Sequence, residues 1–311
     1  MGCTTPTTNF PEAKEITMQV IQFGLGTMGL PMATTLSAEG VDLVATDAME
    51  EARDAFAAAG GRVEHPDAID VSIASVVLTM LPEGSHVRSV YDTILPSMQP
   101  GAVLVDCSTI DVATARELAG HAREYGAELV DAPVSGGPEG AGSGSLSFMV
   151  GGAPVAVEQV RPLLGIMGQR ITVFGDAGMG QAAKACHNMI VGITGLAVFE
   201  GFALAEALGL DVDDFHALCS TAAAACWTLD NRCPAPGVVE NAPSSNDYRP
   251  GFAARLMAKD LRLAQEAAEA ADLETVFGRQ AAERFTAFVD AGNGDLDYSA
   301  IYRTLHPGAS S

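Results

Sequence analysis

Lysine is rare in this chain, and one of its three lysines, Lys184, stands at the beginning of a long apolar segment. The sequence from Gly180 to Asn188 reads Gly-Gln-Ala-Ala-Lys-Ala-Cys-His-Asn, and mostly apolar residues without proline follow as far as Gly209. Residues four apart lie on one face of a helix, so Lys184 and Asn188 would project together. A lysine amine can act as a general acid or base where its surroundings lower its pKa. The alternative is a solvated lysine near the end of a helix.

A glycine-rich stretch near the beginning of the chain reads Gly24-Leu-Gly26-Thr-Met-Gly29. It lies between a β-prone run, 18–23, and a predicted helix, 30–39, which is the context in which this motif binds a dinucleotide. Gly24 would allow the tight turn, Gly26 would let the backbone approach a pyrophosphate, and Gly29 would let helix and strand pack closely. The pyrophosphate would bind the free amides at the N-terminus of the helix.

An acidic residue, Asp47, ends the second predicted strand, 41–46, and follows the last glycine of the motif by 18 residues. A carboxylate here can accept hydrogen bonds from the ribose hydroxyls of NAD and would repel the 2′-phosphate of NADP. The nearest arginine, Arg53, lies a turn or more into the next predicted helix, 48–59. The pattern therefore favours NAD, and a second role for Asp47 as the N-cap of that helix is compatible with it.

Three further segments lie where ligands of open α/β sheets bind, at the carboxyl ends of predicted strands. Strand 73–81 ends at Leu81 and Pro82, and strand 102–106 leads to Thr109. Strand 128–131 leads to Ser135-Gly136-Gly137, a turn with several unshielded amides that suits a carboxylate. Ordinary connecting loops are the alternative reading of all three segments.

These elements predict an α/β fold, with an N-terminal Rossmann-type doubly wound sheet and an all-α C-terminal domain joined by a long interdomain helix. We expect a disordered tail at 1–17, an NAD-binding domain at 18–178, and a helical substrate and oligomerisation domain at 179–311, with the long helix at about 180–209. The other predicted elements are strands 146–150 and 171–174, helices 85–95, 111–125, 154–164, 211–219, 252–271, 274–290 and 297–305, and a long loop at 228–250.

The charge balance of 17 basic against 39 acidic residues gives a net charge of −22, which disfavours nucleic acid and anionic membranes as partners. Abundant acid with little lysine also suggests adaptation to high salt.

Six scattered cysteines without zinc-ligand spacing indicate free thiols, no metal site and a reducing, cytoplasmic location. The most apolar run, 189–199, is too short to span a bilayer before Glu200, so we expect no membrane segment. The run 189–208 is apolar nearly all round and must be covered by its own domain or by another subunit.

Four motifs occur in order along the chain: Gly24 to Met32, Asp131-Ala-Pro-Val-Ser-Gly-Gly, Gly180 to Asn188, and Met257-Ala-Lys-Asp-Leu. Together they resemble the β-hydroxyacid dehydrogenase family over about residues 18–306. Cys226-Trp227, the loop Pro-Ala-Pro-Gly-Val-Val from Pro234, and the run 242–252 are most similar to its 3-hydroxyisobutyrate dehydrogenase branch.

The resemblance implies a role for each motif. Lys184 would be the general acid/base, Asn188 would orient the substrate, and Ser135, Gly136 and Gly137 would bind its carboxylate. The residues implied at the cofactor are Gly24, Leu25, Gly26, Met28, Gly29, Asp47, Leu81, Pro82, Thr109, Phe252 near the nicotinamide, and Lys259. It also implies a homodimer or homotetramer. Two residues depart from the family pattern, since His187 and His86 both stand where relatives have asparagine.

The resulting prediction is NAD-dependent oxidation of (S)-3-hydroxyisobutyrate to methylmalonate semialdehyde, a step of valine catabolism, with Lys184 as the base. One alternative is a related reductase acting on a small semialdehyde, of the tartronate, succinic semialdehyde or 3-hydroxypropionate type, with NADPH. A remoter alternative is a regulator that binds NAD without catalysis.

Overall fold

The strand order of the N-terminal sheet fixes the edge at which a ligand can bind. The computed structural model describes residues 18–305, so the predicted tail at 1–17 lies outside it. Within that range one nine-stranded sheet has the order β3-β2-β1-β4-β5-β6-β8-β7, with β9 paired to β8. The strands are β1 (Gln19–Phe23), β2 (Asp42–Thr46), β3 (Arg62–Val63), β4 (Val76–Thr79), β5 (Val103–Asp106), β6 (Glu128–Asp131), β7 (Val134–Ser135), β8 (Leu146–Gly151) and β9 (Gly168–Gly175).

The strands from β3 to β6 are all parallel, and the chain changes direction across the sheet at β1. From β1 it winds outward through β2 and β3, and it returns to β4 on the other side of β1. The loops after β1 and β4 therefore diverge and leave a crevice at their carboxyl ends, where open sheets bind ligands. The predicted Rossmann-type sheet is confirmed.

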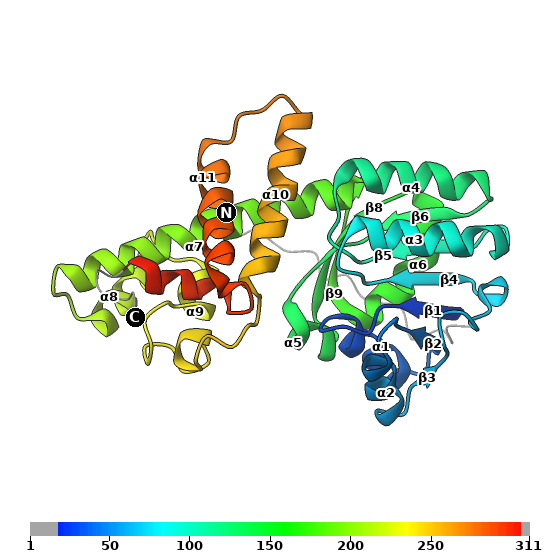
Figure 1. Ribbon diagram of the computed structural model, residues 1–311, viewed down its shortest axis with the longest axis horizontal. Helices are drawn as coiled ribbons and strands as arrows, with labels where there is room; N and C mark the ends of the chain where they lie inside the picture. The colour runs from blue at the N-terminus through cyan, green and yellow to red at the C-terminus, as the bar shows by residue number, and fades with distance from the viewer. Residues whose placement is uncertain (1–17, 306–311) are drawn as a thin grey trace, which may run out of the picture.

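Two apolar clusters, one on each face, hold helices against this sheet. Helices α1, α2, α5 and α6 cover one face, and α3 and α4 cover the other, as Figure 1 shows. The helix bounds are α1 (Gly29–Ala38), α2 (Glu50–Ala58), α3 (Gly84–Ile94), α4 (Val112–Glu124), α5 (Gly137–Gly142) and α6 (Pro154–Met167).

The long helix α7 (Met179–Ala207) has 29 residues, or about 44 Å of length, and runs from the sheet into the helical part (Figure 1). Its first turns pack on β8 and β9, and the rest packs on the helices α10 (Ala254–Ala270) and α11 (Val276–Phe288). The predicted long helix is thus confirmed.

By length and composition alone, α7 could cross a membrane, since the mean hydropathy of its most apolar window of 18 residues is 1.6. Our expectation that the apolar run is too short was therefore wrong, because single glutamates such as Glu200 do not end the apolar character of the helix. The core helix of a folded domain has the same composition, and α7 packs on both parts of the chain. Only 33% of its most apolar window is buried, so much apolar surface remains uncovered.

The C-terminal part is helical, with Phe199, Phe202, Phe285 and Tyr298 at the centre of its core. The predicted N-cap of α8 is confirmed, since Asp211 accepts a hydrogen bond from the main-chain N–H of Asp214. The helices are α8 (Val212–Thr221), α9 (Trp227–Asn231), α10 (Ala254–Ala270) and α11 (Val276–Phe288), and a 3-10 segment covers Tyr298–Leu305.

Some predicted elements differ from the observed ones. The expected strand 73–81 is only Val76–Thr79, because Val71–Ile73 forms a 3-10 turn capped by Asp70. The expected loop 228–250 includes most of α9 and the 3-10 turn Pro243–Ser245, and the two-residue strands β3 and β7 were not predicted. Elements this short depend on their neighbours rather than on a local pattern.

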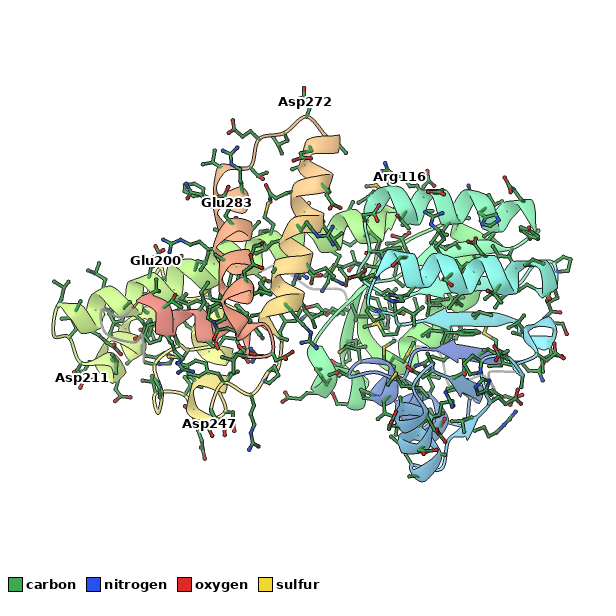
Figure 2. All side chains as sticks on the ribbon, in the orientation of Figure 1. Arg116, Glu200, Asp211, Asp247, Asp272 and Glu283 are labelled. Carbon is green, nitrogen blue, oxygen red and sulfur yellow. The ribbon has the colours of Figure 1, made fainter. Side chains whose placement is uncertain are left out.

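Acidic side chains extend from the outer faces of the helical part. Figure 2 shows Glu200, Asp211, Asp247, Asp272 and Glu283 pointing away from the protein, on helices and connections that surround the core. The excess negative charge therefore lies on the surface.

Candidate active site

At two positions of the glycine turn after β1, neighbouring main-chain atoms lie too close to leave room for a side chain. Gly24 has φ of +101°, and a Cβ atom there would lie 2.2 Å from the main-chain oxygen of Met80. A Cβ on Gly29 would lie 2.1 Å from the main-chain oxygen of Gly24, whereas a Cβ on Gly26 would meet nothing within 4 Å. Gly24 and Gly29 thus allow the turn itself, and Gly26 leaves open space beside its backbone. This is the cradle that a pyrophosphate requires.

A buried glutamine holds this turn. Gln22 Nε2 donates hydrogen bonds to the main-chain oxygens of Gly24 (3.0 Å) and Gly29 (2.7 Å). Sequence reasoning missed it, because a polar residue in a strand gave no signal of its own. The side chain of Leu25 is 2% exposed and packs in the core, so only its backbone can face the cleft, whereas Met28 is partly buried.

The carboxylate of Asp47 lies against the same turn. One oxygen accepts from the N–H of Leu25 at 2.7 Å and the other from the N–H of Met49 at 2.8 Å. The alternative role of Asp47 as a helix N-cap is wrong, because α2 starts at Glu50 and its N-cap position is Met49. Arg53 is nearer than expected, since its guanidinium turns back and donates to the main-chain oxygen of Asp47 at 2.6 Å. A ribose at this edge would meet the Asp47 carboxylate, with the arginine behind it.

The two parts of the chain meet at the carboxyl ends of β4 and β5. Lys259 on α10 donates to the main-chain oxygens of Pro82 (3.1 Å) and Thr109 (2.9 Å). The N–H of Leu81 is fixed by the hydroxyl of Ser108 at 2.8 Å. Leu81, Pro82, Thr109 and Lys259 are therefore brought together at this edge.

The turn Ser135-Gly136-Gly137 connects β7 to α5 and is adjacent to Lys184. Gly136 and Gly137 have φ of +136° and +64°, so the turn depends on both glycines. Lys184 Nζ donates to the main-chain oxygen of Val134, directly before the turn, at 2.7 Å. The helix after the turn is tied to α1 by a hydrogen bond of 2.8 Å from the Thr35 hydroxyl to the Ala141 oxygen. The expected carboxylate seat thus lies beside the lysine and next to the helix that follows the glycine turn.

Lys184 is 8% exposed, which removes the solvated alternative. Burial lowers the pKa of its amine, the negative charge of Asp260 opposes this change, and the positive charge of Lys259 adds to it. An amine with a lowered pKa can be neutral closer to physiological pH, as a general base must be.

Asn188, one turn after Lys184, belongs to a buried network of polar side chains. Its Nδ2 donates to Asp260 at 2.5 Å, and its Oδ1 lies 2.9 Å from Nδ1 of His187. Asp260 in turn lies 3.5 Å from the amine of Lys259. Lys259 and Asp260 therefore connect α7 with the loops at the carboxyl ends of β4 and β5, and Asp260 lies 72 residues after Asn188 in the chain.

Asp131 and Gln181, two motif residues to which the sequence assigned no role, anchor the start of α7. Asp131 at the end of β6 accepts from the N–H of Gly178 at 2.7 Å and from the N–H of Gln181 at 2.8 Å. The side chain of Gln181 donates to the oxygen of Ser108 and accepts from the N–H of Ile110. These contacts set the direction in which α7 leaves the sheet, and with it the position of Lys184.

Phe252 lies before α10, and His86 lies in the first turn of α3. Phe252 precedes α10, its N–H is bound by Asp297 at 3.0 Å, and its ring lies 6.0 Å from that of Tyr298. His86 is exposed on the first turns of α3. No group of three His, Cys, Asp or Glu side chains in residues 18–305 is arranged to hold a metal ion.

Known proteins match both parts of the chain. Residues 19–175 match the NAD-binding domain of 6-phosphogluconate dehydrogenase, and residues 178–305 match the NAD-binding domain of NADP-dependent 3-hydroxyisobutyrate dehydrogenase. A probable 3-hydroxyisobutyrate dehydrogenase of Mycobacterium tuberculosis is 40% identical over 295 residues, 94% of this chain and 100% of that protein. An NAD-dependent L-serine dehydrogenase of Pseudomonas aeruginosa is 40% identical over 292 residues, 93% of this chain and 98% of that protein.

A solved structure agrees with these relatives. The M. tuberculosis 3-hydroxyisobutyrate dehydrogenase with L-serine has a TM-score of 0.88 and 40% identity, and the match covers 94% of this chain and 100% of that one. The crevice beside Gly26 and the buried Lys184 occur in a chain that matches these dehydrogenases over nearly its whole length. The chain therefore belongs to the 3-hydroxyisobutyrate dehydrogenase family of NAD-dependent oxidoreductases.

Proposed function

We propose that this protein oxidises (S)-3-hydroxyisobutyrate to methylmalonate semialdehyde with NAD, in valine catabolism, and that Lys184 is the general base. The observation that carries the proposal is the position of Lys184: a buried amine of lowered pKa, bound to the residue before a Ser-Gly-Gly turn.

Each group at the site has its own part in this reaction. The amides and hydroxyl of Ser135-Gly136-Gly137 would hold the carboxylate, and Asn188 would orient the substrate. The Nζ of Lys184 would take the proton of the primary hydroxyl group. At the same time a C–H bond of the carbon that carries this hydroxyl would break, and the carbonyl would form. Bound NAD supplies the acceptor for the hydride. In the reverse direction the protonated amine would return the proton to the carbonyl oxygen.

L-serine is a second candidate substrate. It differs from 3-hydroxyisobutyrate in carrying an ammonium group in place of the methyl group at the carbon next to the carboxylate. The P. aeruginosa relative is named as an L-serine dehydrogenase, and the M. tuberculosis enzyme was solved with L-serine. Both compounds are 3-hydroxyacids, so the same base and the same carboxylate seat would serve either of them.

A substrate panel tests the proposal. Purified protein would be assayed with 3-hydroxyisobutyrate, L-serine, 3-hydroxypropionate and glycerate, each with NAD and with NADP. We expect the highest kcat/KM for (S)-3-hydroxyisobutyrate with NAD. A higher value for serine would favour the second candidate, and a higher value with NADP would favour a reductase. Inactivity with all substrates, despite NAD binding, would favour a regulator.

We further propose a homodimer or homotetramer, with part of the uncovered apolar surface as its interface. Ile190 on α7 and Phe277 on α11 are 62% and 70% exposed, and α11 packs on Met189 through Gly278. A double change, Ile190→Asp with Phe277→Glu, should lower the mass in sedimentation. Val155→Glu, at an apolar residue on α6 that is 82% exposed, is the control.

A reducing location such as the cytoplasm is proposed on the cysteines. The five that lie within residues 18–305 are all unpaired. Fractionation of cells that express the protein would test this.

A further inference from the structure

Both ends of the Asn188 amide are occupied by side chains, which determines how the amide must point. Nδ2 lies 2.5 Å from Oδ2 of Asp260, and Oδ1 lies 2.9 Å from Nδ1 of His187. An ionised carboxylate can only accept hydrogen bonds, so the NH₂ group faces Asp260. The amide oxygen, which also can only accept, then faces His187.

The proton on His187 follows from this orientation. For the contact with the Asn188 oxygen to be a hydrogen bond, Nδ1 of His187 must carry a hydrogen. Burial lowers the pKa of His187, the hydrogen bond with Asn188 opposes this change, and the positive charge of Lys184 adds to it. The ring is thus favoured in its neutral form, with its hydrogen on Nδ1 and a bare Nε2.

We propose that His187 is a positioning residue for the dehydrogenase reaction: its Nδ1–H holds the oxygen of Asn188, so that one fixed N–H of the amide is left for the substrate. Two contacts, from Asp260 and His187, are needed to define the plane of the amide. With either one alone, the side chain could turn about the remaining bond. Asn188 would then serve the substrate as a hydrogen-bond donor only. The expected effect on kinetics rests on the proposed function. The expected position of the hydrogen on the His187 ring does not.

Substitutions at residue 187 separate donation from packing. In asparagine, Nδ2 is bonded to Cγ just as Nδ1 is in histidine, so His187→Asn can keep a donor at the same place. His187→Leu puts a methyl group there and removes the donor. We expect His187→Asn to keep kcat/KM for the hydroxyacid within about twofold of the original protein. His187→Leu should lower it by about 3- to 10-fold, the effect of one hydrogen bond, with no change in the Kd of NADH.

Nitrogen NMR of protein labelled with ¹⁵N-histidine reports the ring directly. We expect a protonated Nδ1 and a bare Nε2 for His187, identified as the signal that His187→Asn removes. His216 serves as an internal reference in which the other ring nitrogen carries the hydrogen. Its Nε2 lies 3.1 Å from the main-chain oxygen of Leu229, which can only accept, so Nε2 must donate.

Any one of three results would overturn the inference. The first is a His187 ring protonated on Nε2 alone. The second is an unchanged kcat/KM in His187→Leu, and the third is a loss in His187→Asn as large as that in His187→Leu when the two variants have equal thermal stability. If the protein proves inactive with every hydroxyacid, the proposed function fails, while the NMR experiment still decides the state of His187.

Discussion

Lys184 on the interdomain helix donates a hydrogen bond of 2.7 Å to the main-chain oxygen of Val134, 50 residues earlier in the chain. This contact joins the candidate base to the strand that leads into the Ser-Gly-Gly turn. If the carboxylate of the substrate were held at that turn, the hydroxyl group of the substrate would lie within reach of the amine. The lysine is therefore positioned by the sheet as well as by its own helix.

Replacing the amine should abolish turnover without unfolding the protein. Lys184→Met keeps the apolar stem in a buried position and removes the group that accepts the proton. We expect kcat to fall by at least about 10²- to 10⁴-fold, the usual contribution of a general base. The Kd of NADH, measured by fluorescence titration, should stay within about twofold. Turnover close to that of the unmodified protein would remove Lys184 from its assigned role.

The pH dependence of oxidation should report the amine. A general base must be neutral, so kcat/KM rises with pH and reaches half its maximum at the pKa of Lys184. Since burial lowers that pKa, the rising limb should lie below 10.5. The positive charge of Lys259 adds to the lowering, so Lys259→Met should move the limb to higher pH, by up to about one unit. A limb that stays in place or moves to lower pH would contradict this electrostatic coupling.

Asp47 should decide between the two nicotinamide cofactors. Its carboxylate lies at the edge where the ribose would bind, and Arg53 lies behind it. Asp47→Asn keeps an oxygen acceptor and removes the negative charge that repels a 2′-phosphate. We expect the ratio of kcat/KM for NADP to that for NAD to rise by about 10-fold or more, the weight of one charged hydrogen bond. Arg53→Gln in the same background should reverse much of the gain. An unchanged ratio would show that Asp47 does not select the cofactor.

Alanine substitutions at two glycines of the same motif should impair different properties of the protein. Gly24→Ala meets the main-chain oxygen of Met80 and an unfavourable φ, so it should lower the thermal stability of the protein. Gly26→Ala meets nothing within 4 Å and should fold normally. Its methyl group would nevertheless occupy the space for the pyrophosphate, so the Kd of NADH should rise by about 10-fold or more. The comparison combines melting curves with NADH titration, and normal NADH affinity in folded Gly26→Ala would contradict the assigned cradle.

The sequence predicted those parts of the site that depend on local patterns. The glycine turn needs a strand, three glycines and a helix in a row, and Lys184 and Asn188 need only helical spacing. The contacts that orient them could not be predicted, because they join residues far apart in the chain. Asp260 is 72 residues from Asn188, and Asp131 is 47 residues from Gly178. No local pattern marks a carboxylate whose partners are main-chain amides brought to it by packing.

Asp131 provides the last prediction, because it is a buried carboxylate that binds the start of α7. Burial raises its pKa from 3.8 to about 6, although the N–H groups of Gly178 and Gln181 oppose this change. Between these two pH values the folded protein holds the proton and the unfolded chain has lost it. The contribution of Asp131 to stability therefore falls as pH rises through this range. From about pH 5 to about pH 7.5 the loss amounts to about 1.4 kcal/mol.

Asp131→Asn isolates this effect, since an amide of nearly the same shape cannot titrate. The free energy of unfolding of the original protein, minus that of Asp131→Asn, should decrease by that amount over the same pH range. Urea unfolding at several pH values measures this difference, and contributions from acidic groups that do not interact with Asp131 cancel in it. Asp106, whose charge also raises the pKa of Asp131, does not cancel. A difference that stays constant over this range would mean that the two amides stabilise the charged carboxylate at least as much as burial disfavours it. In that case Asp131 would bind α7 as an anion at every pH at which the enzyme works.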